Sequence, residues 1–255
     1  MSFGFGMLCF ENIDPSIKYC RSSGIPHMEI DLTRVPLHEV ERLTPLLVSS
    51  GLGISFHLPW KGTFNPAECK QKDIEYAKRA ALTLMAVNGT HLTMHLGHFV
   101  SGDRASHLKN AACFVRSVLE QKGEFALAIE NTKPNSSVSE KNRLGGELSD
   151  FDVLFAEISD PRLRVCFDTG HAAFSWDIYS SFKHLSDRIC AMHIHDNDGK
   201  NDHIAIGAGQ INWKRLVGQM EAANICGPMI FEVFDRPTHE SVRQFESFMG
   251  HKKSI

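Results

Sequence analysis

The sequence predicts a single (β/α)8 barrel, a TIM barrel that forms one domain over residues 1–255. Three observations lead to this fold class. The length of 255 residues is close to that of one α/β barrel. Eight short apolar runs recur, separated by longer segments with helical spacing of apolar residues. Most of these runs end in a histidine or a carboxylate, and the C-terminal ends of barrel strands open onto one face.

The eight apolar runs are predicted to be parallel β-strands. Their apolar residues follow one another continuously, as expected of strands that are buried on both faces. The predicted strands are residues 3–10, 27–31, 52–57, 91–95, 125–130, 163–168, 189–195 and 229–234. An open, doubly wound sheet is the weaker alternative, because the dinucleotide-binding pattern that Gly4 and Gly6 would begin lacks its third glycine.

The segments between strands are predicted to form helices at residues 36–49, 66–87, 105–121, 213–223 and 242–249. The second of these begins with Pro66, which suits a first helical turn. It places Ile74, Ala77, Ala81 and Leu84 on one face. Eight β-α units favour a closed barrel over an open sheet. The polar stretch 131–146 is predicted to be a surface loop after the fifth strand.

The composition is that of an ordinary soluble globular protein, with 42% hydrophobic and 22% charged residues. The net charge of −3 gives no sign of a nucleic-acid-binding protein. Seven scattered cysteines with no C-x-x-C pair form no disulfide framework, which fits the reducing cytosol. The apolar N-terminal segment is too short for a signal peptide or a membrane span. We therefore expect a cytoplasmic protein.

The polar residues at the strand ends form a candidate metal site. Apolar strands are expected to end in turn residues, yet these end in ionisable groups that the barrel would bring together at one face. In chain order they are Glu29, His57, His95, Glu130, Asp168, His171, His193, His203 and Glu232. Imidazoles combined with carboxylates bind zinc, manganese, iron or cobalt, and sites of this kind without cysteine are usually catalytic. The pattern indicates a divalent metal and no organic cofactor.

Each of these residues also has an ordinary structural explanation. A lone histidine at a strand end is more often a hydrogen-bonded core residue than a ligand, and Asp168 could simply cap the helix that follows. The set is harder to explain in this way, because many unpaired charges in one small mouth are costly without a cation. His98, just past the fourth strand, is a candidate substrate contact. His91 is placed at the opposite end of its strand, and His27, His38, His107, His184, His239 and His251 are expected at the surface.

The ordered motifs resemble a known family. They are His57-Leu-Pro, His95-Leu-Gly, Glu130-Asn-Thr, Asp168-Thr-Gly-His171, His193-Ile-His-Asp, His203-Ile-Ala-Ile-Gly-Ala-Gly and Phe231-Glu232, and they cover nearly the whole chain. This set resembles the xylose isomerase-like TIM-barrel superfamily, which includes sugar isomerases and epimerases, inosose dehydratases and isomerases, hydroxypyruvate isomerase and endonuclease IV.

The resemblance implies roles for individual residues. In the sugar epimerases the matching positions Glu130, Asp168, His193 and Glu232 hold one metal, and the two glutamates are also the acid/base pair. In endonuclease IV the same four belong to a trinuclear zinc site. One further metal there uses the positions of His57 and His95, and the third uses those of His171, His203 and a residue that matches Asn201. Asn201 carries no charge, and this departure counts against a third metal, with the adjacent Asp202 as the candidate substitute.

Two main functions follow from the resemblance. The first is a sugar or polyol isomerase or epimerase, whose substrate could also be a sugar phosphate or an inosose, and which abstracts a proton next to a metal-bound carbonyl. In it, His57, His95, His171 and Glu29 would hold hydroxyls or tune the carboxylates, while His203 and Asp202 would line the distal wall. A dehydratase or lyase on the same scaffold shares the first step.

The alternative is an endonuclease IV-like zinc phosphodiesterase acting on abasic DNA. Lys133, Lys141 and Arg143 after the fifth strand would then contact a phosphate backbone. A non-catalytic barrel that binds a small polar ligand is a third hypothesis, which the complete ligand set opposes. The expected partner is a small carbohydrate, and a homo-oligomer, most simply a dimer, is the default assembly.

Overall fold

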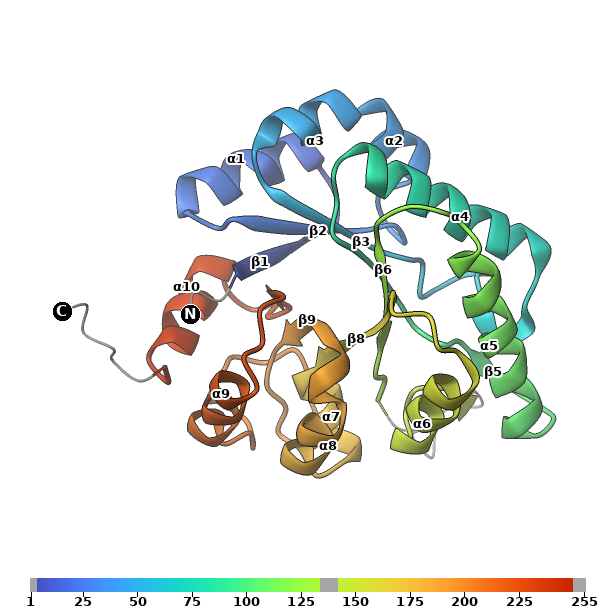
Figure 1. The fold of residues 1–255 in the computed structure, drawn as a ribbon. Helices are drawn as coiled ribbons and strands as arrows, with labels where there is room; N and C mark the ends of the chain where they lie inside the picture. Colours follow the sequence, from blue (N-terminus) through green and yellow to red (C-terminus); the bar gives the residue numbers. More distant parts are fainter. Residues whose placement is uncertain (1–3, 134–141, 250–255) are drawn as a thin grey trace.

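The computed structural model describes residues 4–133 and 142–249. Its parallel strands close into a barrel in the order β1-β2-β3-β4-β6-β8-β9-β10, with β10 pairing back to β1 (Figure 1). This confirms the predicted (β/α)8 architecture. The strands are β1 (Gly4–Cys9), β2 (His27–Asp31), β3 (Gly53–His57), β4 (His91–Met94), β6 (Ala126–Glu130), β8 (Leu163–Asp168), β9 (Ile189–Ile194) and β10 (Pro228–Phe231).

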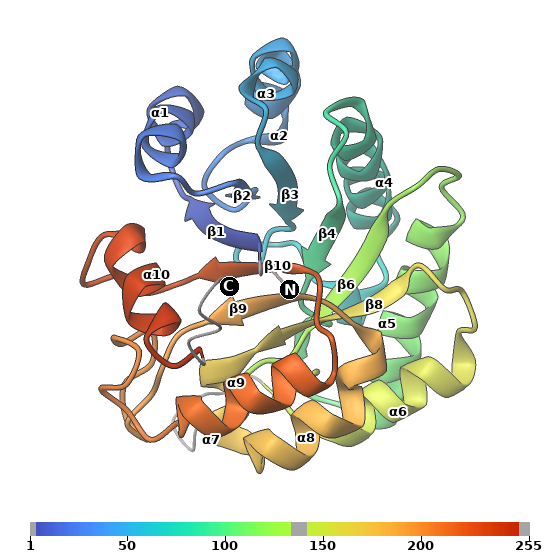
Figure 2. The same cartoon turned by 60° about the vertical axis from the view of Figure 1, so that its left-hand side comes forward.

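Helices lie outside the ring of strands and cover it, as Figures 1 and 2 show from two directions. They are α1 (Ile13–Ser23), α2 (Leu37–Arg42), α3 (Thr44–Ser50), α4 (Gln71–Ala86), α5 (Arg104–Leu119), α6 (Leu148–Glu157), α7 (Thr169–Ser175), α8 (Ile178–Leu185), α9 (Trp213–Ala222) and α10 (Thr238–Glu246), with short 3-10 turns η1 (Pro66–Glu68) and η2 (Ser186–Arg188). Among the described residues no helix combines the length and apolar character needed to cross a membrane.

Three predicted helices differ in detail from the observed ones. The helix predicted at 36–49 is divided into α2 and α3 at Leu43, because Pro45 in the first turn of α3 has no N–H to continue the preceding helix. The helix predicted at 66–87 is divided into η1 and α4, and Cys69 between them has a left-handed backbone with φ of 51°. The last helix begins at Thr238, directly after Pro237, rather than at residue 242.

Most of the described residues of the stretch 131–146 are packed at the mouth of the barrel rather than exposed in a surface loop, although Arg143 is exposed. Strand β7 (Asn142–Arg143) pairs in antiparallel fashion with β5 (His98–Phe99). Leu144 is fully buried, and its backbone N–H donates to the carbonyl of Gly97 at 3.0 Å. The prediction was wrong for these packed residues, because two-residue strands are too short to show a period in the sequence. Residues 134–141 lie outside the described residues.

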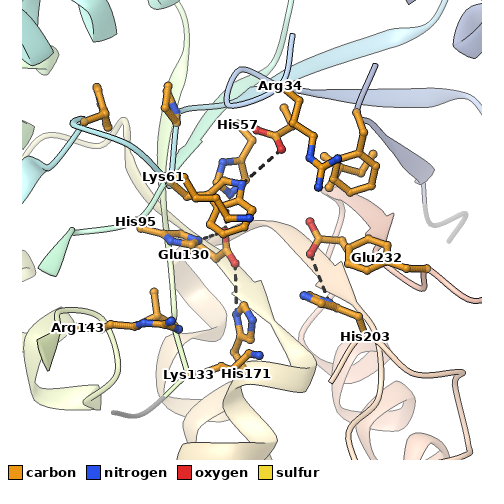
Figure 3. A pocket seen from close by; sticks show the side chains of 18 of the residues that line it. Arg34, His57, Lys61, His95, Glu130, Lys133, Arg143, His171, His203 and Glu232 are labelled. Carbon is orange, nitrogen blue, oxygen red and sulfur yellow. Dashed lines mark hydrogen bonds and ion pairs between the residues drawn. The ribbon is translucent and has the colours of Figure 1, made fainter. Parts of the chain in front are cut away.

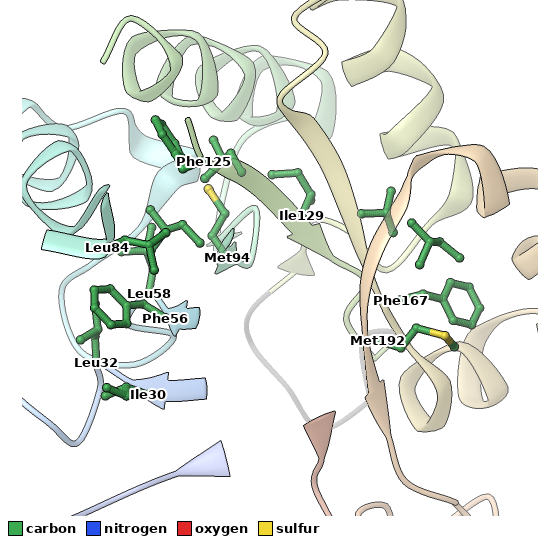
Figure 4. Close-up of a cluster of buried hydrophobic side chains, with 14 of the residues drawn as sticks. Ile30, Leu32, Phe56, Leu58, Leu84, Met94, Phe125, Ile129, Phe167 and Met192 are labelled. Carbon is green, nitrogen blue, oxygen red and sulfur yellow. The ribbon is translucent and has the colours of Figure 1, made fainter. Parts of the chain in front are cut away.

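The apolar core lies between the strands and the helices, and Figure 4 shows part of it around Phe56, Leu84 and Met94. Side chains of alternate residues point to opposite faces of a strand. On β2, Met28 and Ile30 belong to this outer core, whereas Glu29 bonds to residues of other strands across the barrel interior. The same alternation directs polar side chains of β3, β4 and β9 into the barrel interior, where they contribute to the site.

Candidate metal centre and cavity

A cavity of about 1010 Å³ opens at the C-terminal ends of the strands. Its lining includes six of the nine predicted strand-end residues, and Figure 3 shows them around its floor and walls. These six are His57, His95, Glu130, His171, His203 and Glu232. His98 also lines the cavity, and its backbone N–H donates to Asn65 Oδ1 at 3.0 Å. The mouth of the barrel therefore collects the strand-end residues in one space, as barrel geometry requires.

Among the four residues expected to hold a metal, three carboxylates surround one nitrogen of the fourth, His193. The Nδ1 of His193 lies 3.2 Å from Glu232 Oε1, 3.5 Å from Glu130 Oε1 and 3.9 Å from Asp168 Oδ2. All four side chains are buried. They come from β6, the end of β8, β9 and the residue after β10, so the closed order of the strands is what brings them together.

The hydrogen bonding of His193 shows that this group of atoms suits a cation. Its Nε2 lies 2.8 Å from Glu29 Oε1, and a carboxylate can only accept, so Nε2 carries a proton. The buried Nδ1 has no hydrogen-bond partner among the described residues. Burial lowers the pKa of His193, but Cys166 and the carboxylates of Glu232 and Glu130 raise it well above its ordinary value. The surroundings of Nδ1 therefore favour a positive charge, and a divalent cation could take the place of the proton there. One imidazole and three carboxylates form a donor set of the kind that binds zinc, manganese, iron or cobalt.

The two glutamates of this group are held in different electrostatic states. Burial, with the added negative charges of Glu130 and Asp168, raises the pKa of Glu232 to about 7. Burial would also raise the pKa of Glu130, but the nearby charges of His95 and His193 hold it well below its ordinary value. Two buried carboxyl groups in one site thus have their pKa values pushed in opposite directions.

Glu130 also joins the central group to a second cluster. Its Oε2 lies 2.8 Å from His57 Nε2 and 3.0 Å from His95 Nε2, while its Oε1 faces His193. His57, His95 and Glu130 offer three ligand atoms close enough to hold an ion of their own. The alternative is that the two imidazoles fix the orientation of the Glu130 carboxylate.

A third cluster contains a histidine that the sequence analysis missed. His195 is fully buried, and its Nε2 lies 2.9 Å from Asp168 Oδ1. Together with His171 and His203 it offers a further three-histidine group. The available signal was the alternation along β9, since residues 193 and 195 point to the same side of a strand. Gly170 of the Asp-Thr-Gly motif makes room for it, because a Cβ at this position would collide with the His195 ring.

Asn201 and Asp202 have different surroundings. Asn201 is exposed, and its amide Nδ2 donates to Asp198 Oδ2 at 3.0 Å in a local turn. Asp202 lies nearer the site, with its Oδ2 3.9 Å from the Nε2 of His171 and 3.9 Å from the Nε2 of His203. The ammonium of Lys133 forms an ion pair with the same carboxylate oxygen. A cationic side chain therefore already stands at this end of the cavity.

Glu29 lies beneath the four candidate metal ligands and does not line the cavity. Its Oε2 accepts hydrogen bonds from Ser55 Oγ at 2.9 Å and Thr93 Oγ1 at 3.0 Å, and lies 3.2 Å from His91 Nε2. The prediction that His27 is a surface residue was wrong, because its ring is buried and its Nε2 lies 2.9 Å from Ser55 Oγ. These residues form a buried polar network that supports His193 from below. His251 lies outside the described residues.

Comparison with known proteins gives the family and the fold. The family model for the xylose isomerase-like TIM barrel matches residues 17–249. A probable endonuclease 4 of Methanocorpusculum labreanum is 28% identical over 141 residues, which are 46% of this chain and 48% of the relative. An uncharacterized protein, y4fM, of Sinorhizobium fredii is 34% identical over 85 residues, 31% of this chain and 26% of the relative. The match thus spans about half of one relative and about a quarter of the other.

Among solved structures, a D-tagatose 3-epimerase-like protein superimposes with a TM-score of 0.84 at 19% identity, covering 96% of this chain and 97% of the other. The 3-keto-D-glucoside 4-epimerase of E. coli gives a TM-score of 0.77 at 15% identity, covering 96% and 100%. The D-allulose 3-epimerase of Methylomonas sp. gives 0.75 at 15% identity, covering 91% and 84%. At these identities the likeness shows a shared fold.

Proposed function

The chain belongs to the xylose isomerase-like TIM-barrel family, and on that premise we propose that it is a divalent-metal-dependent enzyme that isomerises or epimerises a sugar or polyol. The observation that supports this most directly is the convergence of three carboxylates on the unpartnered Nδ1 of His193. The likeness of the fold to solved sugar epimerases also supports it.

In this proposal Glu130, Asp168, His193 and Glu232 hold the metal. The bound cation would polarise the substrate carbonyl and stabilise the negative charge that develops when the neighbouring carbon loses its proton. Cysteine is missing from the group, as is usual for catalytic rather than structural sites.

In this proposal Glu130 and Glu232 also move the protons. Both carboxylates line the cavity and approach the same nitrogen from β6 and from the end of β10, on two sides of the cavity floor (Figure 3). A carbon between them could lose a proton to one and receive a proton from the other on the opposite face, which is the requirement for inverting a stereocentre. His57 and His95 hold Glu130 by its other oxygen and so fix its direction.

The experiment that tests this function measures proton exchange. The protein is purified without chelator, its metal content is determined by elemental mass spectrometry, and it is incubated in D2O with ketoses, inososes and their phosphates. We expect about one metal per chain and deuterium at the carbon next to the carbonyl, detected by NMR. Exchange followed by loss of water would instead indicate a dehydratase, and no exchange with any substrate would contradict the proposal.

A second candidate function is the zinc phosphodiesterase acting on abasic DNA. The two additional histidine clusters and the similarity to a probable endonuclease 4 favour it. The ion pair between Lys133 and Asp202 opposes it, because a cationic side chain occupies the surroundings of a carboxylate that a third zinc would need. Cleavage of an abasic duplex by protein with two or three zinc ions per chain would establish the nuclease instead.

A further inference from the structure

Two cationic side chains stand on one wall of the cavity. Arg34 follows β2, Lys61 follows β3, and both line the cavity that also contains Glu130 and Glu232 (Figure 3). Both are exposed to solvent. Within the described part of the chain, neither side chain forms an ion pair or hydrogen bond with a carboxylate. The wall therefore presents two positive charges that form no ion pair with any described residue.

Each of these cations rests on an aromatic ring. The Arg34 guanidinium lies 5.2 Å from the centre of the Phe10 ring, and Lys61 Nζ lies 3.9 Å from that of Trp60. Such contacts orient a cation without neutralising its charge. Both rings line the same cavity, so these contacts keep the two solvent-exposed cations at its wall.

The carboxylate on this wall, Asp31, is bonded to neutral N–H donors and forms no ion pair with Arg34 or Lys61. Asp31 is almost fully buried, with Oδ2 3.3 Å from Trp60 Nε1 and Oδ1 2.7 Å from the backbone N of Thr33. The backbone N–H of Trp60 donates to Thr33 Oγ1 at 3.2 Å. These bonds join the loop after β2 to the loop after β3, and so place Arg34 and Lys61 on the same side of the mouth.

The opposite side of the mouth differs in its charge balance. Lys133 and Arg143, which follow β6, also line the cavity, but Lys133 is paired with Asp202. The cavity volume of about 1010 Å³ reaches the upper end of the range of roughly 300–1,000 Å³ for small-molecule sites. There is room for a substrate with a group that extends from the metal centre to the wall.

From these features we infer that Arg34 and Lys61 bind a terminal oxyanion of the substrate, so that the substrate is a phosphorylated or carboxylated sugar rather than a neutral one. The inference rests on the proposed function and names its substrate class. A neutral sugar offers hydroxyls, which give two unpaired cations no charge partner. An oxyanion provides this charge partner, and the guanidinium group of Arg34 can form two parallel hydrogen bonds with a carboxylate or a phosphate.

The test compares matched ligands on the metal-loaded full chain. Isothermal titration calorimetry measures the dissociation constants of D-fructose, D-fructose 6-phosphate, D-fructuronate and inorganic phosphate. At least one of the two anionic ketoses should bind about tenfold tighter than D-fructose or more, because charge-assisted hydrogen bonds add to the shared sugar contacts. Preference for the phosphate or for the carboxylate identifies which oxyanion the wall accepts. Equal affinity for all three ketoses would overturn the inference.

Variants assign the effect to the two residues. The double variant Arg34→Met, Lys61→Met keeps the apolar stems but removes both charges, and it should lose most of the preference for the anionic ligand. The matched control, Arg243→Met, Lys109→Met, removes one arginine and one lysine that are exposed and do not line the cavity, and it should keep the preference. A preference that survives in the first variant would contradict the assignment.

The two experiments distinguish a failure of the oxyanion site from a failure of the proposed isomerase function. Tighter anion binding without deuterium exchange into any sugar would preserve the oxyanion site and remove the isomerase. Exchange into neutral ketoses with no anion preference would preserve the isomerase and remove the oxyanion site. Tight binding of an abasic duplex that depends on Arg34 and Lys61 would also overturn the inference, since the wall would then serve a phosphodiester backbone.

Discussion

Glu29 Oε1 lies 2.8 Å from His193 Nε2, and this contact joins β2 to β9 across the interior of the barrel. The carboxylate is fully buried, and its other oxygen is held by Ser55, Thr93 and His91. Glu29 therefore fixes both the proton and the direction of the His193 ring. In the proposed metal site, this support would aim the Nδ1 of His193 at the position of the metal.

The first prediction concerns this support. In Glu29→Gln an amide nitrogen replaces one oxygen, so a donor faces either His193 or the hydroxyls of Ser55 and Thr93. We expect metal affinity to fall by about 10–100-fold, the usual effect of losing a partner of a ligand histidine. Competition with a chromophoric chelator measures this affinity. Thr93→Val, which removes a single donor to the same carboxylate, should have a smaller effect, and unchanged affinity in Glu29→Gln would show that the contact does not position His193.

The second prediction concerns His193 itself. His193→Ala removes the nitrogen on which three carboxylates converge, so metal content after purification should drop well below one per chain. Elemental mass spectrometry gives the value. His184→Ala, at an exposed histidine that pairs with Asp152, serves as the control and should keep full occupancy. If His193→Ala retains its metal, the ligand set is wrong.

The third prediction separates chemistry from folding. Glu130→Gln keeps the shape of the side chain but removes a charge and a proton carrier, so deuterium exchange into the substrate should be lost, with little change in the melting temperature. Glu120→Gln, on the exposed surface beside Lys78, should retain normal exchange. Near-normal exchange in Glu130→Gln would remove Glu130 from the acid/base role.

The fourth prediction concerns stability at the mouth of the barrel. Asp150 on α6 is buried, and its carboxylate pairs with Arg104 at 2.6 Å and accepts a bond from the backbone N of Gly145 at 2.7 Å. Asp150→Ala leaves both donors without this partner, and because Arg104 is partly solvated we expect a loss of about 2–3 kcal/mol in the free energy of unfolding. Urea denaturation measures it. Asp152→Ala, two residues further along α6 and exposed, should change stability by less than about 0.5 kcal/mol.

The barrel and its mouth could be predicted from the sequence because parallel strands buried on both faces leave continuous apolar runs. Each predicted strand overlaps an observed one, and six of the nine ionisable residues predicted at the strand ends line the cavity at one face, whereas Glu29 lies beneath it. The apolar runs did not show which side chains of a strand point into the barrel. His27 and Glu29 alternate with Met28 and Ile30, so the polar pair points inward although the run as a whole is buried.

The remaining differences have local causes. His195 was missed because it follows His193 by two residues and was counted only as part of the strand. The pairing of β5 with β7 depends on residues more than forty positions apart, and two-residue strands carry no periodic signal. Arg34 and Lys61 belong to loops, where position depends on tertiary contacts such as the bond from Trp60 to Asp31 rather than on any motif.

The buried network beneath His193 reaches a residue with no side chain at all. A Cβ on Gly53 would lie 2.5 Å from His27 Nδ1. Displacing that ring would disturb Ser55, then Glu29, and through the bond of Glu29 to Nε2 the direction of the His193 ring, whose Nδ1 is the proposed metal ligand. The proposed metal centre is thus expected to be sensitive to a single methyl group at the opposite end of β3. The substitution Gly53→Ala, at the N-terminal end of β3, would therefore weaken a site at the other end of the barrel.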